Sequence, residues 1–349
     1  MPAVAAPPPS LTEPPAPPPP RTSRRTRHTR HRAGTSRLAV LLVSPTLAVL
    51  ALVAGYPVLA AFRESLFAEQ SGLDSSGFVR EGETFVGLQH YADIFRGEAG
   101  ERFWNAFANT SFFTVTTVAA ETVLGVAMAL VMHHVVRGRG LVRASILVPW
   151  AIPTAVSALL WQWIFQADGV ANALTGREVL WTTDGGQAAF AVIIADTWKT
   201  APFVGLLVLA GLQLIPGEVY EAARVDGARP WQQFLRITLP LVRPVLLVAV
   251  LFRLLDSLRM FDLPYVLIGA RKESVETLSM LSFDEAANTR YGPAAAYAVI
   301  LFLYVAATAF VFVKLLGADI LATDRPAKSG GSRARRFRRR NGSGSEVTA

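Results

Sequence analysis

The chain contains no cysteine, so disulfide bonds and thiolate metal sites are excluded. Charged residues are scarce as well: they make up 17% of the 349 residues, against about 25% in an average soluble domain. Apolar residues account for 52% of the chain and gather in long runs with almost no charge. This composition indicates a protein that lies largely within a membrane.

The sequence also lacks the motifs of common catalytic sites. There is no G-x-x-x-x-G-K-[ST] segment, so the chain cannot hold ATP phosphates in the manner of a P-loop. The five histidines are scattered, and the adjacent His133 and His134 do not share a helix face, so we expect no metal site there. We therefore expect a non-catalytic subunit without a bound cofactor, and any ATP and Mg²⁺ on partner subunits.

The net charge of +8 is concentrated at the two ends of the chain. Residues 1–36 combine a proline run with an arginine and histidine cluster, and residues 318–349 end in a second arginine cluster. Both segments have too little apolar surface to offset the entropy of ordering, and neither interleaves aromatic residues with its charges. We predict two disordered, cytoplasmic tails that bind no nucleic acid.

Six segments are long and apolar enough to cross the roughly 30 Å hydrocarbon core as helices. They cover residues 38–62, 107–132, 145–165, 187–212, 244–263 and 293–316. The connections that follow the second and fourth spans, and both tails, are rich in arginine, whereas the other connections lean acidic. By the positive-inside rule, both termini are predicted to be cytoplasmic in a multi-pass protein of the bacterial plasma membrane.

The connection from Gln213 to Arg243 differs from an ordinary loop. Pro216 suits the start of a short helix, Gly227 permits a turn, and Pro230 suits the start of a second helix. We expect Pro240 and Pro244 to end that second helix before the next span. The pattern predicts a helix-turn-helix at the membrane surface with Ala222 and Ala223 exposed. From these residues alone it is equally an amphipathic connection between two spans.

The spacing of this loop resembles a known family. Glu221-Ala222-Ala223, Asp226-Gly227, Ile237 and Leu239-Pro240 match the EAA loop of ABC importer permeases. The resemblance implies an all-α membrane domain with the type I ABC importer fold, in which this loop docks on an ATPase. It implies that the contact is made or shaped by the following residues: Glu221, Ala222, Ala223, Asp226, Gly227, Ile237, Leu239 and Pro240.

The resemblance covers residues 38–317 and is closest to permeases for trehalose, maltose and related sugars. It implies four kinds of partner: a second permease subunit, two ATP-binding subunits, an extracytoplasmic solute-binding lipoprotein and a sugar. The expected organisation is a first span with an extracytoplasmic segment at 37–106 and a permease core at 107–317 that contains the loop 213–243. Residues 268–272 depart from the family's usual glycine-rich turn, which leaves the shape of that outer turn open.

Charges at membrane depth are costly and usually face a cavity or a partner. In the fifth span Arg253, Asp256, Arg259 and Asp262 recur every three residues, which suits either an ion ladder along one helix side or a polar wall of a path. The family resemblance places eight residues on the substrate path: Trp150, Thr154, Lys199, Thr200, Phe203, Arg253, Asp256 and Ser257. Glu121 in the second span is a further buried acid for which the sequence names no partner.

Three alternatives remain at this point. Lys199 and Arg253 also suit a phosphate, which a glycerol-phosphate permease would require. A secondary transporter driven by an ion gradient would need paired broken helices, and the sequence has no such matched pair. A membrane assembly subunit without a path would use the charges of the fifth span for pairing only.

Overall fold

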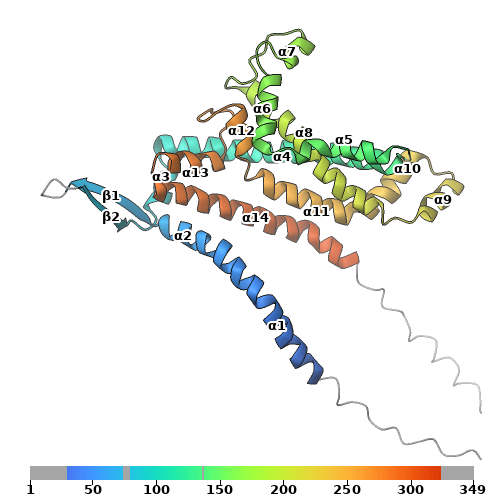
Figure 1. Cartoon of the computed structure of the whole chain (residues 1–349), viewed down its shortest axis with the longest axis horizontal. Coiled ribbons are helices and arrows are strands. Elements are labelled where there is room, and N and C mark those ends of the chain that lie inside the picture. The colour runs from blue at the N-terminus through green and yellow to red at the C-terminus, as the bar shows by residue number, and fades with distance from the viewer. Residues whose placement is uncertain (1–29, 74–78, 136, 324–349) are drawn as a thin grey trace, which may run out of the picture. The chain divides into compact units, whose positions relative to one another are not determined.

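The computed structural model describes residues 30–73, 79–135 and 137–323 of the chain, and the side chains of residues 40–69, 82–135 and 137–315. The predicted tail segments 1–29 and 324–349 lie outside the described residues. The chain divides into two units, Met1–Leu59 and Ala60–Ala349. The second unit holds the sites discussed below (Figure 1).

The described chain is almost entirely helical, as the sequence predicts. Its elements, in order, are α1 (Arg30–Leu50), η1 (Ala51–Gly55), α2 (Tyr56–Glu64), β1 (Phe67–Leu73), β2 (Val79–Phe85), α3 (Gln89–Ile94), α4 (Gly97–His134), α5 (Arg139–Ala151), α6 (Thr154–Ile164), α7 (Val170–Thr175), α8 (Gly186–Leu212), α9 (Gly217–Val225), α10 (Pro230–Gln233), η2 (Phe234–Thr238), α11 (Leu239–Ser257), α12 (Asp262–Leu267), α13 (Leu278–Ala287) and α14 (Tyr291–Thr323). Five helical stretches among the described residues are long and apolar enough to cross a membrane, and there are six when the bent pair α5–α6 counts as one span.

The first and last helices are longer than their predicted spans. Helix α1 begins at Arg30, inside the segment predicted to be a disordered tail, and α14 continues to Thr323, past the predicted boundary at 317. Arginine, alanine and leucine favour helix, so a helix started by an apolar run extends into flanking residues of these types. The segment between the first two spans also contains the antiparallel hairpin β1–β2, in which Phe67 pairs with Phe85, and this hairpin was not predicted.

Helices α4 and α8 form the most extensive helix pair of the second unit. Their backbones approach closely at Gly125 of α4. A Cβ atom at this position would lie 2.7 Å from Cβ of Val204 and 3.0 Å from the carbonyl oxygen of Ala201, so no side chain fits there. Small residues at helix contacts allow this kind of packing within membranes. The pair α4–α8 is therefore the tightly packed centre on which the sites are built.

The predicted third span, 145–165, is not one straight helix. Helices α5 and α6 meet at Ile152 and Pro153 with a bend of 95°. Pro153 lacks an amide hydrogen and fixes its φ angle, so the helix that precedes it ends there. As a result α6, with α7 beyond it, projects away from the direction of α4, α5 and α8 (Figure 1). The predicted third span is therefore helical but broken, and it counts as a span only when α5 and α6 are taken together.

The predicted helix break at Pro240 and Pro244 is also wrong. The chain stays helical from Pro230 to Ser257, through the π-helical turn η2 and into α11. Pro240 lies in the first turn of α11, directly after η2, and the wider π turn removes part of the clash between a proline ring and the preceding carbonyl groups. The fifth span thus ends at Ser257, before its predicted end at 263.

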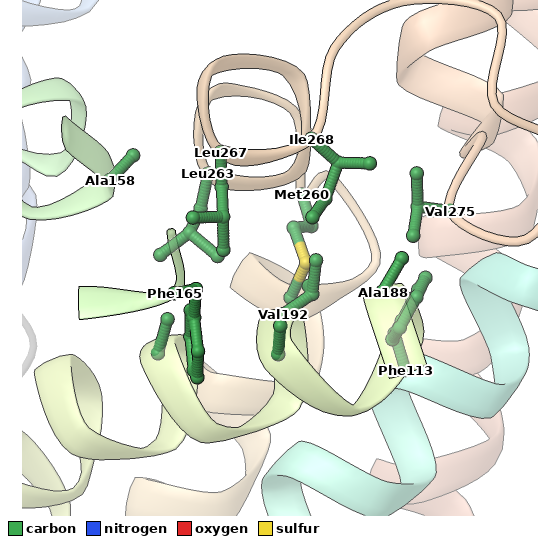
Figure 2. Close-up of a cluster of buried hydrophobic side chains, with 12 residues drawn as sticks. Phe113, Ala158, Phe165, Ala188, Val192, Met260, Leu263, Leu267, Ile268 and Val275 are labelled. Carbon is green, nitrogen blue, oxygen red and sulfur yellow. The ribbon is translucent and has the colours of Figure 1, made fainter. Parts of the chain in front are cut away.

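Beyond α11 the chain turns into the short helix α12, which closes an apolar cluster with α6 and α8. Figure 2 shows Leu263 and Leu267 of α12 beside Phe165 and Val192. All four side chains are buried. This cluster fixes the position of the end of α11. The charged residues Arg253 and Asp256 near that end are therefore held in a defined position.

Candidate functional site

Four charged side chains from three helices meet in the core of the second unit, and we call them the central charge cluster. They are Glu121 of α4, Asp196 of α8, and Arg253 and Asp256 of α11. Arg253 Nε and Nη2 donate to the two carboxylate oxygens of Glu121 at 2.5 and 2.8 Å. Nη2 also donates to Asp196 at 3.0 Å, and Nη1 donates to Asp256 at 2.6 Å.

The central charge cluster is buried on one side and open on the other. Glu121 and Arg253 expose 0% and 3% of their surface, whereas the side chain of Asp256 is 63% exposed. Burying an unpaired charge is strongly unfavourable, and a guanidinium that donates to three carboxylates avoids this cost. Thr200 adds a hydroxyl 2.5 Å from Glu121 Oε1, which fixes the carboxylate from a second direction. The cluster therefore joins α4, α8 and α11 and presents one carboxylate outward.

Lys199 of α8 makes a hydrogen bond to the backbone of the neighbouring helix break. Its Nζ atom donates to the carbonyl oxygen of Ile152 at 2.9 Å, at the break between α5 and α6. A helix that ends at a proline leaves carbonyl groups without amide partners, and these groups need donors when they are buried. Lys199 thereby stabilises the bend at Ile152 and Pro153.

The open side of the central charge cluster faces two cavities. The larger one, of about 780 Å³, is lined by the predicted path residues Trp150, Thr200, Phe203, Arg253 and Asp256. The smaller one, of about 280 Å³, is lined by seven predicted path residues: Trp150, Thr154, Lys199, Thr200, Arg253, Asp256 and Ser257. All eight residues that the resemblance placed on the path are thus brought together around these two cavities.

An aromatic pair lines the larger cavity together with the charges. The rings of Trp150 and Phe203 stack with centroids 5.9 Å apart and planes 29° apart. Ser257 is buried and its hydroxyl lies 3.1 Å from that of Thr117, so it contributes more to packing than to the cavity surface. Apolar rings beside charged and hydroxyl groups form the kind of wall that holds a sugar.

The ion ladder expected along the fifth span exists only in part. Arg253 pairs with Asp256, and Arg259 Nη2 lies 3.8 Å from Asp256. Asp262 does not continue the row, because α11 ends at Ser257 and Asp262 begins α12. Sequence reasoning missed the bonds from Arg253 to Glu121 and Asp196. The sequence did indicate that partners were needed, because two acids and one arginine at membrane depth must be paired. The spacing of residues within one helix, however, does not reveal a partner on another helix.

The second candidate site is the loop between α8 and α11. Helix α9 ends in a turn in which Gly227 adopts φ +77°, the amide of Ala228 donates to Ala223 O at 2.9 Å, and the amide of Gly227 donates to Arg224 O at 3.1 Å. These are the two hydrogen bonds of a Schellman motif, which places glycine at this position. The helix-turn-helix predicted here is confirmed, with α9 and α10 as its helices.

Two further hydrogen bonds hold this loop in shape. The hydroxyl of Tyr220 lies 3.1 Å from that of Thr238, and Gln233 donates to Ala228 O at 2.8 Å. Ala223 lies three residues after Tyr220, on the same helix face, and is only 8% exposed. The prediction that Ala223 is exposed is therefore wrong, because its face of α9 is turned inward.

The outward face of the loop is open. Ala222, Asp226 and Glu221 are exposed, and Val225 is 88% exposed. Of the remaining residues predicted to couple, Ile237 and Leu239 are half-buried and Pro240 is exposed. A short, rigid helix with an exposed small residue and two carboxylates can dock against another protein.

The opposite end of the second unit has its own set of ion pairs, the outer charge cluster. Arg102 of α4 donates to both carboxylate oxygens of Glu276, at 2.8 and 2.5 Å, and to Asp284 at 3.0 Å. Arg271 also donates to Asp284, at 3.0 Å. Burial raises the pKa of Asp284, but the hydrogen bonds from the two arginines outweigh this, so its pKa lies below the ordinary value.

The outer turn that departs from the family pattern is held by a second acid. Asp184 accepts hydrogen bonds from the amides of Glu273 and Ser274 at 3.1 and 2.9 Å, and from the Ser274 hydroxyl. The hydrogen bond from the Ser274 side chain holds the pKa of Asp184 below its ordinary value. The segment 268–277 is thus tied to the turn before α8 and is well defined.

Comparison with known proteins identifies the family. Residues 121–321 match the family described as the inner membrane component of binding-protein-dependent transport systems. The chain belongs to this family. The family predicted from the EAA loop is therefore confirmed. The chain is a multi-pass ABC transporter permease of the inner membrane.

Several characterised permeases are similar along most of their length. The trehalose/maltose transport system permease protein MalF of Thermococcus litoralis is 36% identical over 80% of this chain and 94% of its own. The trehalose transport system permease protein SugA of Mycobacterium tuberculosis is 37% identical over 83% of this chain and 92% of its own. A bacterial ABC transporter involved in alginate import has the same fold, with a TM-score of 0.68 at 21% identity over 85% of this chain and all of the matched chain. The predicted type I importer fold is confirmed.

Proposed function

We propose that this permease is the membrane subunit of an ATP-driven, binding-protein-dependent importer for trehalose or a related di- or oligosaccharide. It forms half of the translocation path, and the loop 213–243 couples it to the ATPase. Two features observed together carry the proposal. The EAA loop has an exposed face, and a cavity of about 780 Å³ is lined by both stacked rings and charged groups. Both termini and the EAA loop are cytoplasmic in this proposal.

The charges around the cavities favour a neutral solute over glycerol phosphate. Three acids and three bases line the two cavities: Asp196, Asp256, Asp262, Lys199, Arg253 and Arg259. Glu121 lies behind them and adds a fourth acid, so no net positive charge is available for a phosphate. Arg253, which a phosphate would need, already makes four hydrogen bonds to carboxylates. Sugar hydroxyl groups can instead bond to the exposed Asp256, and the apolar face of a sugar ring can stack on Trp150.

The projecting helix α6 supports a second permease subunit as partner. Leu159, Leu160 and Trp163 of α6 are exposed, and the polar loop 166–185 follows them. Because α6 turns by 95° from α5, it does not run along the bundle toward the membrane surface, and the loop after it would lie at membrane depth. Lipid cannot form hydrogen bonds with the polar backbone of that loop. A related subunit that covers α6 removes this conflict and completes the path. Two ATP-binding subunits and an extracytoplasmic solute-binding lipoprotein complete the proposed importer.

The coupling role is tested in the assembled complex. Glu221→Lys reverses an exposed charge on the docking face, and Gly227→Val strains the φ +77° turn. Both variants are expected to insert normally into the membrane but to lose transport and to co-purify with less ATPase. Gly217→Ala is the matched control, since this glycine of α9 has open space around it and no positive φ. Normal transport in both loop variants would refute the coupling role.

The solute is tested by uptake in a deletion strain with radiolabelled trehalose and sn-glycerol 3-phosphate. Loss of trehalose uptake with retained glycerol-phosphate uptake supports the proposal. The reverse result would assign the permease to the phosphate. Uptake that persists after the ATPase partner is inactivated would favour a secondary transporter.

A further inference from the structure

Arg253 lines both cavities, and two of its four hydrogen bonds to carboxylates go to an acid that lies behind the cavity walls. Glu121 is not among the residues that line either cavity and has no exposed surface. It nevertheless supplies two of the four hydrogen bonds that Arg253 makes to carboxylates. The guanidinium is therefore a cation at the cavity wall with its counter-charge on the next helix behind it.

We propose that Glu121 is a specificity-determining residue of the transport path. By neutralising Arg253 from behind, it keeps the cavity wall from attracting anions and so leaves the path open to uncharged solutes. This inference rests on the proposed function and names a residue that sets its selectivity without touching the solute.

The two other carboxylates around Arg253 are less suited to this role. Asp256 is largely exposed and lies 3.8 Å from Arg259, so its charge is shared and open to hydroxyl groups of a solute. Asp196 accepts a single hydrogen bond from Arg253, at 3.0 Å. Glu121 makes a two-bond pair, and Thr200 holds its carboxylate in place.

Removing the charge of Glu121 changes the net charge around the two cavities. With Glu121, the cavity-lining charges and the acid behind them sum to one net negative charge; without it, they sum to zero, and Arg253 loses its two-bond partner. A cavity with low-dielectric walls concentrates ions of the sign opposite to its charge. Neutralising Glu121 is therefore expected to remove the repulsion of anions by the wall and to let them approach Arg253 more closely.

Trp150 provides a local probe, because it lines both cavities together with Arg253. In the full chain, assembled with its partner subunits in nanodiscs, the other six tryptophans are replaced by phenylalanine. Quenching of Trp150 fluorescence is then measured with iodide, an anion, and with acrylamide, which is neutral. The ratio of the two quenching constants reports the local potential and cancels changes in general accessibility.

Glu121→Gln keeps the size of the side chain and is expected to raise the iodide-to-acrylamide ratio about twofold or more. Glu276→Gln is the matched control: it neutralises the two-bond partner of Arg102 in the outer charge cluster, which does not line either cavity, and should leave the ratio unchanged. An unchanged ratio in a Glu121→Gln complex that assembles normally would overturn the proposal.

A second pair of variants tests the same inference if Glu121→Gln fails to assemble. Arg253→Gln leaves the charge of Glu121 unpaired and should lower the ratio below that of the parent, whereas the double variant Arg253→Gln with Glu121→Gln should restore it. A ratio at or above the parent value in Arg253→Gln would also contradict the proposal. Because quenching involves no transported solute, a wrong assignment of the sugar would alter the uptake results and leave this pattern intact.

Discussion

The central and outer charge clusters use the same chemical arrangement in different surroundings. In each, one arginine holds a glutamate through two hydrogen bonds and at least one aspartate through one, and it thereby joins segments far apart in sequence. Arg102 of the outer charge cluster has a side chain that is 31% exposed, whereas that of Arg253 is 4% exposed. Water reaches Arg102 more readily than Arg253, although Glu276 is only 5% exposed, so equal contacts should contribute unequally.

The largest expected effect comes from breaking the central charge cluster. Arg253→Met leaves Glu121 and Asp196 as buried carboxylates without their cation, which is expected to cost about 3–5 kcal/mol. The variant should show a sharply lower yield of folded complex and a lower apparent melting temperature. A melting temperature equal to that of the parent would show that the buried acids do not depend on Arg253.

A smaller effect is expected from the same substitution in the outer charge cluster. Arg102→Met removes the arginine partner of Glu276 and one of two arginine partners of Asp284, and we expect the remaining arginine and the partial exposure of Arg102 to reduce the cost to about 1–3 kcal/mol. The comparison is made by thermal unfolding of both variants under one condition. If Arg102→Met is as damaging as Arg253→Met, burial is not what distinguishes the two clusters.

Lys199 provides a test of a single charged donor that bonds to the backbone beside the central charge cluster. Lys199→Met keeps a long apolar side chain but leaves the Ile152 carbonyl at the helix break without its donor. We expect a loss of about 1 kcal/mol, measured as a small drop in melting temperature. Lys199→Arg should retain most of the stability, since it keeps a donor and the charge.

The smallest effect is a dependence of stability on pH that belongs to the outer charge cluster. The folded-state pKa of Asp284 is lowered, so its contribution is present above the unfolded value of about 3.9 and is lost as the pH falls through the folded value. The melting temperature should fall less steeply below about pH 4 in Asp284→Asn than in the parent. Equal slopes would mean that Asp284 does not stabilise the fold through its charge.

The parts of the structure that the sequence predicts are those encoded by local pattern. Apolar runs predicted the spans, and the spacing from Glu221 to Pro240 predicted the family and the helix-turn-helix of the EAA loop. Gly227 was predicted to permit a turn, and it lies at a positive φ angle in a Schellman motif. The family pattern also selected eight residues that line the cavities around the central charge cluster.

What could not be predicted depends on contacts between distant residues or on competition between local rules. The partner of Glu121 lies on α11, and no spacing within α4 points to it. Pro153 bends the third span by 95°, whereas Pro244 is accommodated inside α11. The residue type alone therefore does not predict whether a proline breaks a helix. The burial of Ala223 depends on how α9 folds against η2, which the motif alone does not state.

The contact at Gly125 has a consequence for how such a permease can move. With Val204 and the Ala201 carbonyl in van der Waals range of the glycine backbone, α4 and α8 cannot slide past one another without a steric clash. We therefore expect α4 and α8 to move together as one rigid unit in any change of conformation of the permease. A single methyl group added at Gly125 would lie 2.7 Å from Cβ of Val204, so it would force α4 and α8 apart and they would no longer move as one unit.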